Sequence, residues 1–232
     1  MLYYVTDRAA FAGDEPVRRR QLLDKIAEAA RCGVDYIQLR EKDLSPRELE
    51  RLAQQAIEAL SSAKKQAPGS RRATALLINS RSDVALAAGA DGVHLRSDDV
   101  PACDVRMSWS SSASKGGAGT LARENSPRRP IVAVSCHTRA EVAQAKAEAA
   151  DFAVFAPVFE KKNAPGVPSV GLGALREACR AGIPVLALGG ITLENAQSCF
   201  AAGAAGIAAI RLFQENDIAT VVEKLRSLAP SV

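Results

Sequence analysis

Three side chains at the end of a strand-like run could bind phosphate groups. The run passes through Gln38 into Arg40 and Lys42, and positions 38 and 40 share one face of an extended strand. Arginine offers a planar fork of N–H donors that matches phosphate oxygens, and lysine offers a compact positive charge. The spacing therefore predicts an anion-binding group at this strand end.

Two acids are interleaved with these cations. We expect Glu41 and Asp43 to be solvated loop charges. The alternative for Arg40 is a structural ion pair with a carboxylate such as Asp99. We favour anion binding for Arg40 because Gln38 shares its face.

A pair of glycines gives a second anion-binding signal. Gly189 and Gly190 end the apolar run at 184–190, and Thr192 can cap a helix that begins at Leu193. Bare backbone N–H groups before a helix form a cradle for phosphate. The alternative is a glycine pair that only permits a tight turn.

Polar residues end three other strand-like runs. Alternation predicts that they face the same side as Gln38 and Arg40: Asn79, His94, Arg96, Ser135 and His137. His137 could act as a general acid or base, because an imidazole titrates near neutral pH. The alternative for His137 is a hydrogen bond to a neighbouring loop. Cys136 should point away from His137, and we expect it to be a core thiol.

The evidence for a metal site is one pair of acids. Asp98 and Asp99 follow the run at 92–96, where a carboxylate could bind Mg²⁺. The alternative is an aspartate that caps a helix. His94 and His137 are the only histidines, which argues against a histidine-rich zinc site.

The elements that would position these residues alternate along the chain. Short apolar runs indicate strands at 2–6, 36–40, 75–79, 92–96, 131–136, 152–158, 184–190 and 206–211. Apolar residues at three- and four-residue spacing indicate helices at 17–31, 47–66, 138–150, 172–181 and 215–228. Capping boxes at 45–48 and 138–141 mark two helix starts. Gly33, Gly89 and Gly203 suit the left-handed residue that closes a helix.

This alternation predicts an α/β fold, a single (β/α)8 TIM barrel over residues 1–232. In such a barrel the active site lies where the strands end. A doubly wound open sheet is the second choice. Residues 104–130 are rich in serine and glycine, so we expect a flexible excursion there, after a short turn at 101–106, in place of a packed fourth helix.

Composition limits the class of ligand. The net charge is +4, from 30 basic and 26 acidic residues, and no basic helix face is visible. This argues against nucleic acid and suits a small anion. No signal-like or long apolar segment is visible, so we expect neither secretion nor membrane insertion. The five cysteines form no C-x-x-C pair and indicate reduced thiols in a cytoplasmic protein.

Taken together, the chain resembles the thiamine phosphate synthase and thiazole tautomerase superfamily. The matching segments follow the family order along nearly the whole chain: YYVTD (3–7), IQLREKD (37–43), LLINSRSDVAL (76–86), GADGVHLRSDD (89–99), VSCHTRAEV (134–142), FAPVFEK (155–161), LGGITLENA (188–196) and AGAAGIAAI (202–210). Each motif is modest alone, whereas the series is specific.

The resemblance implies a transferase of thiamine biosynthesis. Such an enzyme joins a hydroxymethylpyrimidine pyrophosphate to a thiazole phosphate, releases pyrophosphate and uses Mg²⁺. By position, it implies catalytic roles for Arg40 and His137 and an Mg²⁺ ligand in Asp99. The implied substrate-binding residues are Gln38, Arg40, Lys42, Asn79, Arg96, Ser135, Lys161, Lys162, Gly189, Gly190, Ile210 and Arg211.

The chain departs from the synthase pattern at several of these strand ends. Ser80 stands where the synthases have an Mg²⁺-binding aspartate, so Mg²⁺ binding is expected to be weak or absent. Arg96, Lys162 and Arg211 stand in segments where the pattern has uncharged or hydroxyl residues. The tautomerase branch also lacks the metal aspartate and carries a histidine where His137 stands.

Two further functions therefore stay open beside the synthase. One is a thiazole tautomerase, which aromatises a thiazole phosphate by proton transfer. The other is a non-catalytic barrel that binds phosphate ligands. A homo-oligomer is possible with any of the three.

Overall fold

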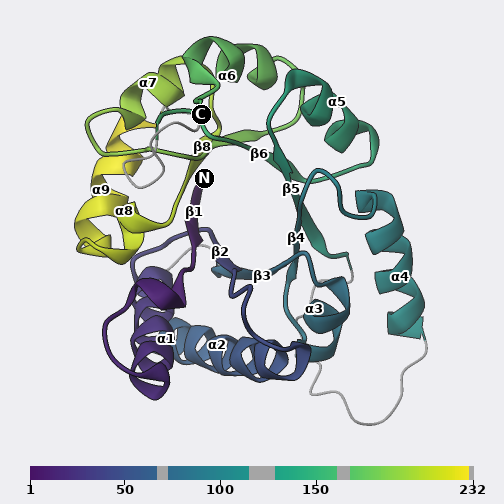
Figure 1. The fold of residues 1–232 in the computed structure, drawn as a ribbon, viewed down its shortest axis with the longest axis vertical. Helices are drawn as coiled ribbons and strands as arrows, with labels where there is room; N and C mark the ends of the chain where they lie inside the picture. The colour runs from purple at the N-terminus through teal and green to yellow at the C-terminus, as the bar shows by residue number, and fades with distance from the viewer. Residues whose placement is uncertain (67–72, 115–128, 161–167, 230–232) are drawn as a thin grey trace.

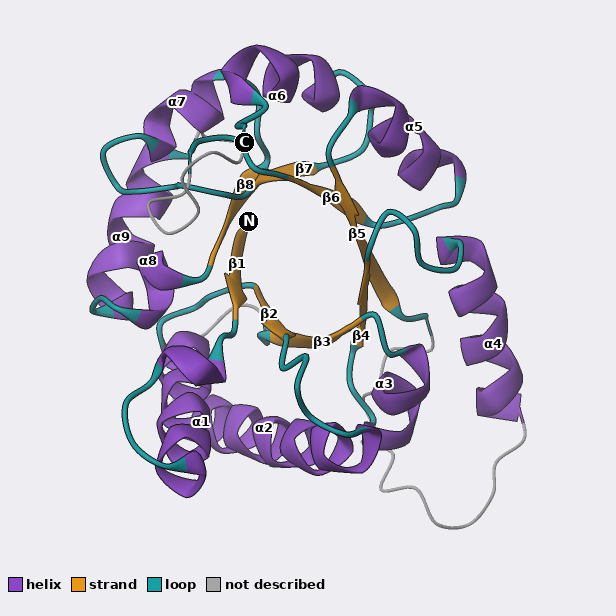
Figure 2. Cartoon of the chain, in the orientation of Figure 1, coloured by secondary structure: helices purple, strands orange, loops and turns teal. Residues whose placement is uncertain are grey.

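The strands form a closed ring that is surrounded by helices (Figure 1). The computed structural model describes residues 1–66, 73–114, 129–160 and 168–229. Eight parallel strands pair in sequence order from β1 to β8, and β8 pairs back with β1. This closure confirms the TIM barrel and rules out the open sheet. Figure 2 shows the ring of strands inside the helical layer.

The element bounds agree with the predicted strands to within a few residues. The strands are β1 (Leu2–Val5), β2 (Tyr36–Leu39), β3 (Ala75–Asn79), β4 (Gly92–Leu95), β5 (Ile131–Cys136), β6 (Phe152–Phe155), β7 (Val185–Ala187) and β8 (Gly206–Ala209). The helices are η1 (Arg8–Ala10), α1 (Glu15–Arg31), α2 (Pro46–Gln66), α3 (Ser82–Ala88), α4 (Ala102–Ser114), α5 (Arg139–Ala147), α6 (Gly171–Cys179), α7 (Ala196–Ala201), α8 (Arg211–Gln214) and α9 (Ile218–Leu228). Across the ranges that the structure describes, every helix is too short or too polar to cross a lipid bilayer.

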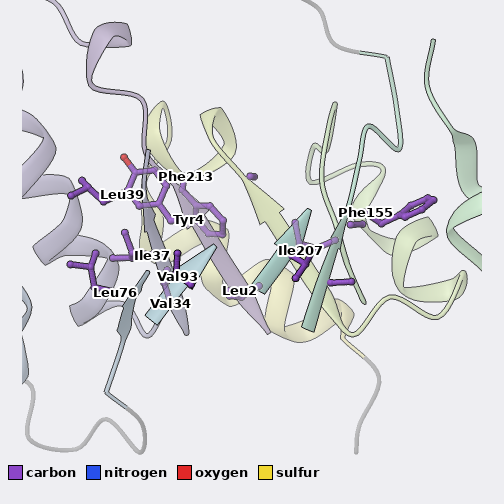
Figure 3. Packing of buried hydrophobic residues seen from close by; sticks show 14 of the residues in the cluster. Leu2, Tyr4, Val34, Ile37, Leu39, Leu76, Val93, Phe155, Ile207 and Phe213 are labelled. Atoms are coloured by element: carbon purple, nitrogen blue, oxygen red, sulfur yellow. The ribbon is translucent and has the colours of Figure 1, made fainter. Parts of the chain in front are cut away.

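The core has two layers because side chains alternate along each strand. The larger layer lies between the strands and the helices and includes Leu2, Ile37 and Leu76 (Figure 3). The smaller layer fills the barrel interior and includes Tyr3 and Phe152. The rings of these two residues meet edge to face at a centroid distance of 5.7 Å. The packed interior leaves the carboxyl ends of the strands as the place for chemistry.

The predicted helix signals at five boundaries are present. Ser45 and Glu48 exchange hydrogen bonds at the start of α2, and Thr138 and Glu141 form a full capping box on α5. The glycines that follow α1, α3 and α7 have positive φ values, as the sequence indicated: Gly33, Gly89 and Gly203. These capping residues and glycines fix where the helices begin or end, and so where the loops to the neighbouring strands lie.

The prediction of a flexible excursion at 104–130 was wrong for its first part. Helix α4 continues to Ser114, although serine is common in it. Ala102, Val105 and Trp109 are buried at helical spacing, and this narrow apolar stripe is sufficient to pack the helix. Residues 115–128 lie outside the described residues.

Candidate active site

The inward positions at the ends of β2 and β3 are joined by hydrogen bonds. Gln38 Nε2 donates to Asn79 Oδ1 at 3.1 Å, and Asn79 Nδ2 donates to Ser80 Oγ at 3.4 Å. Gln38 is 3% exposed, and its hydrogen bond to Asn79 fixes the amide beneath the barrel mouth. The alternation that placed Gln38 and Asn79 on one face is therefore confirmed.

A buried histidine occupies the next strand. The hydroxyls of Tyr3 and Ser135 bond the Nδ1 and Nε2 atoms of His94 at 2.9 and 2.8 Å. The pKa of His94 is lowered to about 3, first by burial and then by the charge of Arg40, while Asp99 opposes the shift. The ring is thus neutral near pH 7, with one nitrogen donating and the other accepting.

Positive charge gathers above this polar layer. The pKa of Lys42 is lowered by the charge of Arg40, then by burial and the charge of Arg96, so Lys42 experiences the positive charge of both arginines. Among the described residues, no carboxylate forms an ion pair with Arg40 or Lys42. The alternative, an ion pair between Arg40 and Asp99, is not found. Arg40 and Lys42 therefore remain available to an anion.

Arg96 is held differently from Arg40. Its guanidinium pairs with Asp98 at 3.1 Å and with Asp99 at 3.4 Å, and its backbone N–H donates to Asp99 Oδ2 at 2.7 Å. Asp99 therefore closes a turn after β4 and does not cap α4, which begins at Ala102. Arg96 reaches the site, but its charge is shared with two acids.

Glu41 is not a solvated loop charge, and that expectation was wrong. The Glu41 side chain is 2% exposed and pairs with Arg8 at 3.0 Å. Asp43 is 65% exposed and also pairs with Arg8, at 2.7 Å. The sequence could have indicated this role, because Glu41 lies on the same face of the strand as Ile37 and Leu39. A carboxylate that faces the helical layer needs a partner.

The glycine pair after β7 has a structural reason. Gly189 and Gly190 have φ values of 101° and 64°. A Cβ on Gly189 would lie 2.7 Å from Pro157 Cα, and one on Gly190 would lie 2.6 Å from the carbonyl oxygen of Glu160. Both the conformation and the close β6 loop demand glycine. A phosphate-binding role for the pair stays a prediction.

The segments beside this pair differ in part from the expected arrangement. Thr192 and Asn195 exchange hydrogen bonds, but α7 begins only at Ala196, so the predicted start at Leu193 was wrong. At the end of β8, Ile210 precedes α8 and the exposed Arg211 lies 3.5 Å from Glu215.

His137 lies at the rim of the barrel. Its side chain is exposed, and Nδ1 donates to the carbonyl oxygen of Ala156 at 2.6 Å. This is the alternative bond to a neighbouring loop, in which Nδ1 is the donor because a carbonyl oxygen can only accept. Cys136 points into the core, as predicted, and burial raises its pKa to about 12. Lys161 and Lys162 lie outside the described residues.

The donor set fits Mg²⁺ only in part. No cluster of three His, Cys, Asp or Glu side chains suited to a metal occurs in the described ranges. Asp99 is held on the backbone of Arg96, and the N–H of Ser80 donates to the carbonyl oxygen of His94 at 2.8 Å. Ser80 and Asp99 thus follow two neighbouring strands, β3 and β4, and together they offer one carboxylate.

A small cavity of about 80 Å³ adjoins this site on the helical side of β4 and β5. Its lining includes Leu95 and Val134, which face the helical layer, together with residues of α5 and the loop residues Arg96 and Asp99. The chemistry of the barrel mouth lies on the opposite face of these strands.

Comparison with known proteins identifies the family. The family model for thiamine monophosphate synthase matches residues 2–213. A thiamine-phosphate synthase of Syntrophomonas wolfei is 34% identical, over 98% of this chain and 95% of that protein. One of Roseiflexus castenholzii is 37% identical, over 90% of this chain and 79% of that protein. The solved thiamine phosphate pyrophosphorylase from Pyrococcus furiosus superposes with a TM-score of 0.72 at 25% identity, over 98% of this chain and 94% of that one. The chain therefore belongs to the thiamine monophosphate synthase family.

Proposed function

We propose that the chain is a transferase that couples a hydroxymethylpyrimidine pyrophosphate to a thiazole phosphate. The observation that carries this is the pair of cations at the end of β2. Arg40 and Lys42 lie close together without an acidic partner among the described residues. Such a pair is suited to the several negative charges of pyrophosphate.

The charge distribution suits a dissociative reaction. The bond between the pyrimidine methylene carbon and the pyrophosphate oxygen breaks, and the thiazole nitrogen attacks the resulting carbocation. Negative charge grows on the leaving oxygens, where Arg40 and Lys42 can stabilise it. The product thiazolium carries the positive charge, so the step needs no general base.

Neutral groups complete the proposed site. Gln38 and Asn79 are tied to each other, and Ser135 is tied to His94. Fixed dipoles of this kind can orient a ligand without reorganising during the reaction. Because His94 is uncharged, it adds no repulsion to a carbocation beside it. The glycine pair after β7, with Ile210 and Arg211, would receive the thiazole phosphate.

Mg²⁺ is used by the synthase family in general, and we propose weak binding to this chain. Asp99 would hold the ion through one carboxylate. Mg²⁺ usually takes its remaining oxygens from water and substrate phosphates. When bound, the ion would neutralise charge on the pyrophosphate. With Ser80 in place of an acid, most of the neutralisation falls to the fixed cations.

A tautomerase is the second candidate function. The supporting observation is the His137 ring, whose Nδ1–H is held by Ala156 and whose Nε2 is open to accept a proton. A non-catalytic phosphate binder is the third candidate. The proposal also includes a cytoplasmic location, which the five free thiols support.

Pyrophosphate binding tests the proposed site. Calorimetry should show that inorganic pyrophosphate binds the chain, and that Mg²⁺ binds measurably only when pyrophosphate is present. The reason is that a lone carboxylate makes a poor Mg²⁺ site. Absence of pyrophosphate binding, with or without Mg²⁺, would contradict the proposed function.

A further inference from the structure

One arginine joins both acids that alternate with the proposed phosphate-binding cations. Arg8 Nη1 donates to Glu41 Oε2 at 3.0 Å and to Asp43 Oδ1 at 3.1 Å, and Nη2 donates to Asp43 Oδ2 at 2.7 Å. The Arg8 side chain is only 6% exposed. A single planar group therefore spans positions 41 and 43 and restricts the backbone between them.

The same cluster fixes the preceding residue. The backbone N–H of Arg40 donates to Thr6 Oγ1 at 3.0 Å, and Thr6 Oγ1 donates to Glu41 Oε1 at 2.6 Å. The backbone N–H of Arg8 also donates to both oxygens of Glu41. Strand β1 and the loop after it thus bind the segment 40–43 from one side.

The four charges are thus divided by their partners. Glu41 and Asp43 are engaged by Arg8, while Arg40 and Lys42 have no such partner among the described residues. Two cations held close together repel each other, as the lowered pKa of Lys42 reflects. A rigid tie on the acids can keep the cations together before an anion arrives, which removes a reorganisation step.

We propose that Arg8 is the positioning residue of the pyrophosphate site, because its fork on Glu41 and Asp43 keeps Arg40 and Lys42 turned together to the barrel mouth. The inference rests on the proposed function, since it concerns the same site. Arg8 itself would touch no substrate.

Lysine at position 8 is the sharpest test. Arg8→Lys keeps the charge but loses the planar fork, so inorganic pyrophosphate with Mg²⁺ should bind about tenfold more weakly in calorimetry, the loss of roughly one charged hydrogen bond. The matched control is Arg19→Lys. Arg19 shares Glu15 with Arg8 and also pairs with Glu48, but it bonds neither Glu41 nor Asp43, so its replacement should leave pyrophosphate affinity unchanged.

Arg40→Ala separates this inference from the function on which it rests. If Arg8 acts through Arg40, the two effects on pyrophosphate affinity should be coupled. Arg8→Lys should then weaken binding less when it is made in the Arg40→Ala variant than when it is made in the wild-type chain. If Arg40→Ala weakens binding and Arg8→Lys does not, the inference fails and the proposed site stands. If neither substitution changes the affinity, both fail.

A milder variant covers the case in which Arg8→Lys does not fold. Asp43→Asn removes one arm of the fork at an exposed carboxylate and should weaken pyrophosphate binding by about threefold, as for a typical single hydrogen bond. A merely structural role would lower the midpoint of unfolding and leave the pyrophosphate affinity of the folded variant unchanged, which would overturn the proposal.

Discussion

Replacing Arg40 and Lys42 together by alanine should lower kcat/KM for the pyrimidine pyrophosphate by about 10²–10⁴-fold. A hydrogen bond to a charged group contributes about 1.5–3 kcal/mol, and two such losses sum to about 3–6 kcal/mol at about 1.4 kcal/mol for each tenfold. The loss should appear in kcat as well as in KM, since the leaving pyrophosphate gains charge in the transition state.

Initial rates of product formation measure this effect, with circular dichroism to establish folding. The matched control is Arg51→Ala with Lys64→Ala, which removes the same two charges from exposed positions on α2. That pair should change kcat/KM by less than about threefold, because distant exposed charges are screened. A loss below tenfold in the Arg40 and Lys42 double variant would remove these residues from the centre of the mechanism.

The second large effect concerns stability. Arg8→Met should lower the free energy of unfolding by about 3–5 kcal/mol near pH 8, because it leaves the buried Glu41 carboxylate without its cation. Arg19→Met is the control, since Arg19 makes only partly exposed ion pairs, and it should lower the free energy by less than about 1 kcal/mol.

The stability loss in Arg8→Met should shrink in acid. Burial raises the pKa of Glu41 above its ordinary value even with Arg8 present, and removal of Arg8 should raise it further. The folded state then holds a proton over a pH range in which the unfolded state has lost it, so stability falls as pH rises through that range. Urea unfolding at pH 5 and pH 8 measures the difference. An equal loss at both pH values, or a loss below 1 kcal/mol, would contradict this role of the pair.

The barrel and its inward-facing polar residues could be predicted because they follow from local rules. Side chains alternate along any strand, so Gln38, Asn79, His94 and Ser135 could be assigned to one face before the closure of the barrel was known. The capping boxes on α2 and α5 were equally readable, since a box needs only four consecutive residues.

The parts that could not be predicted depend on contacts between distant segments. The role of Glu41 depends on Arg8, which is 33 residues away in the chain and meets it only because β1 and β2 are neighbours. Helix α4 depends on the burial of Trp109, which composition does not reveal. The bond of His137 to Ala156 depends on the register of β5 and β6.

The central claim is the coupling of two phosphorylated substrates, and product analysis tests it most directly. The purified chain would be incubated with the hydroxymethylpyrimidine pyrophosphate, the thiazole phosphate and Mg²⁺, and separately with the thiazole phosphate tautomer alone. We predict thiamine phosphate and pyrophosphate in equal amounts in the first incubation, and no aromatisation above the uncatalysed rate in the second. Aromatised thiazole without pyrophosphate release would identify a tautomerase, and absence of both products would identify a binding protein; either result would contradict the account.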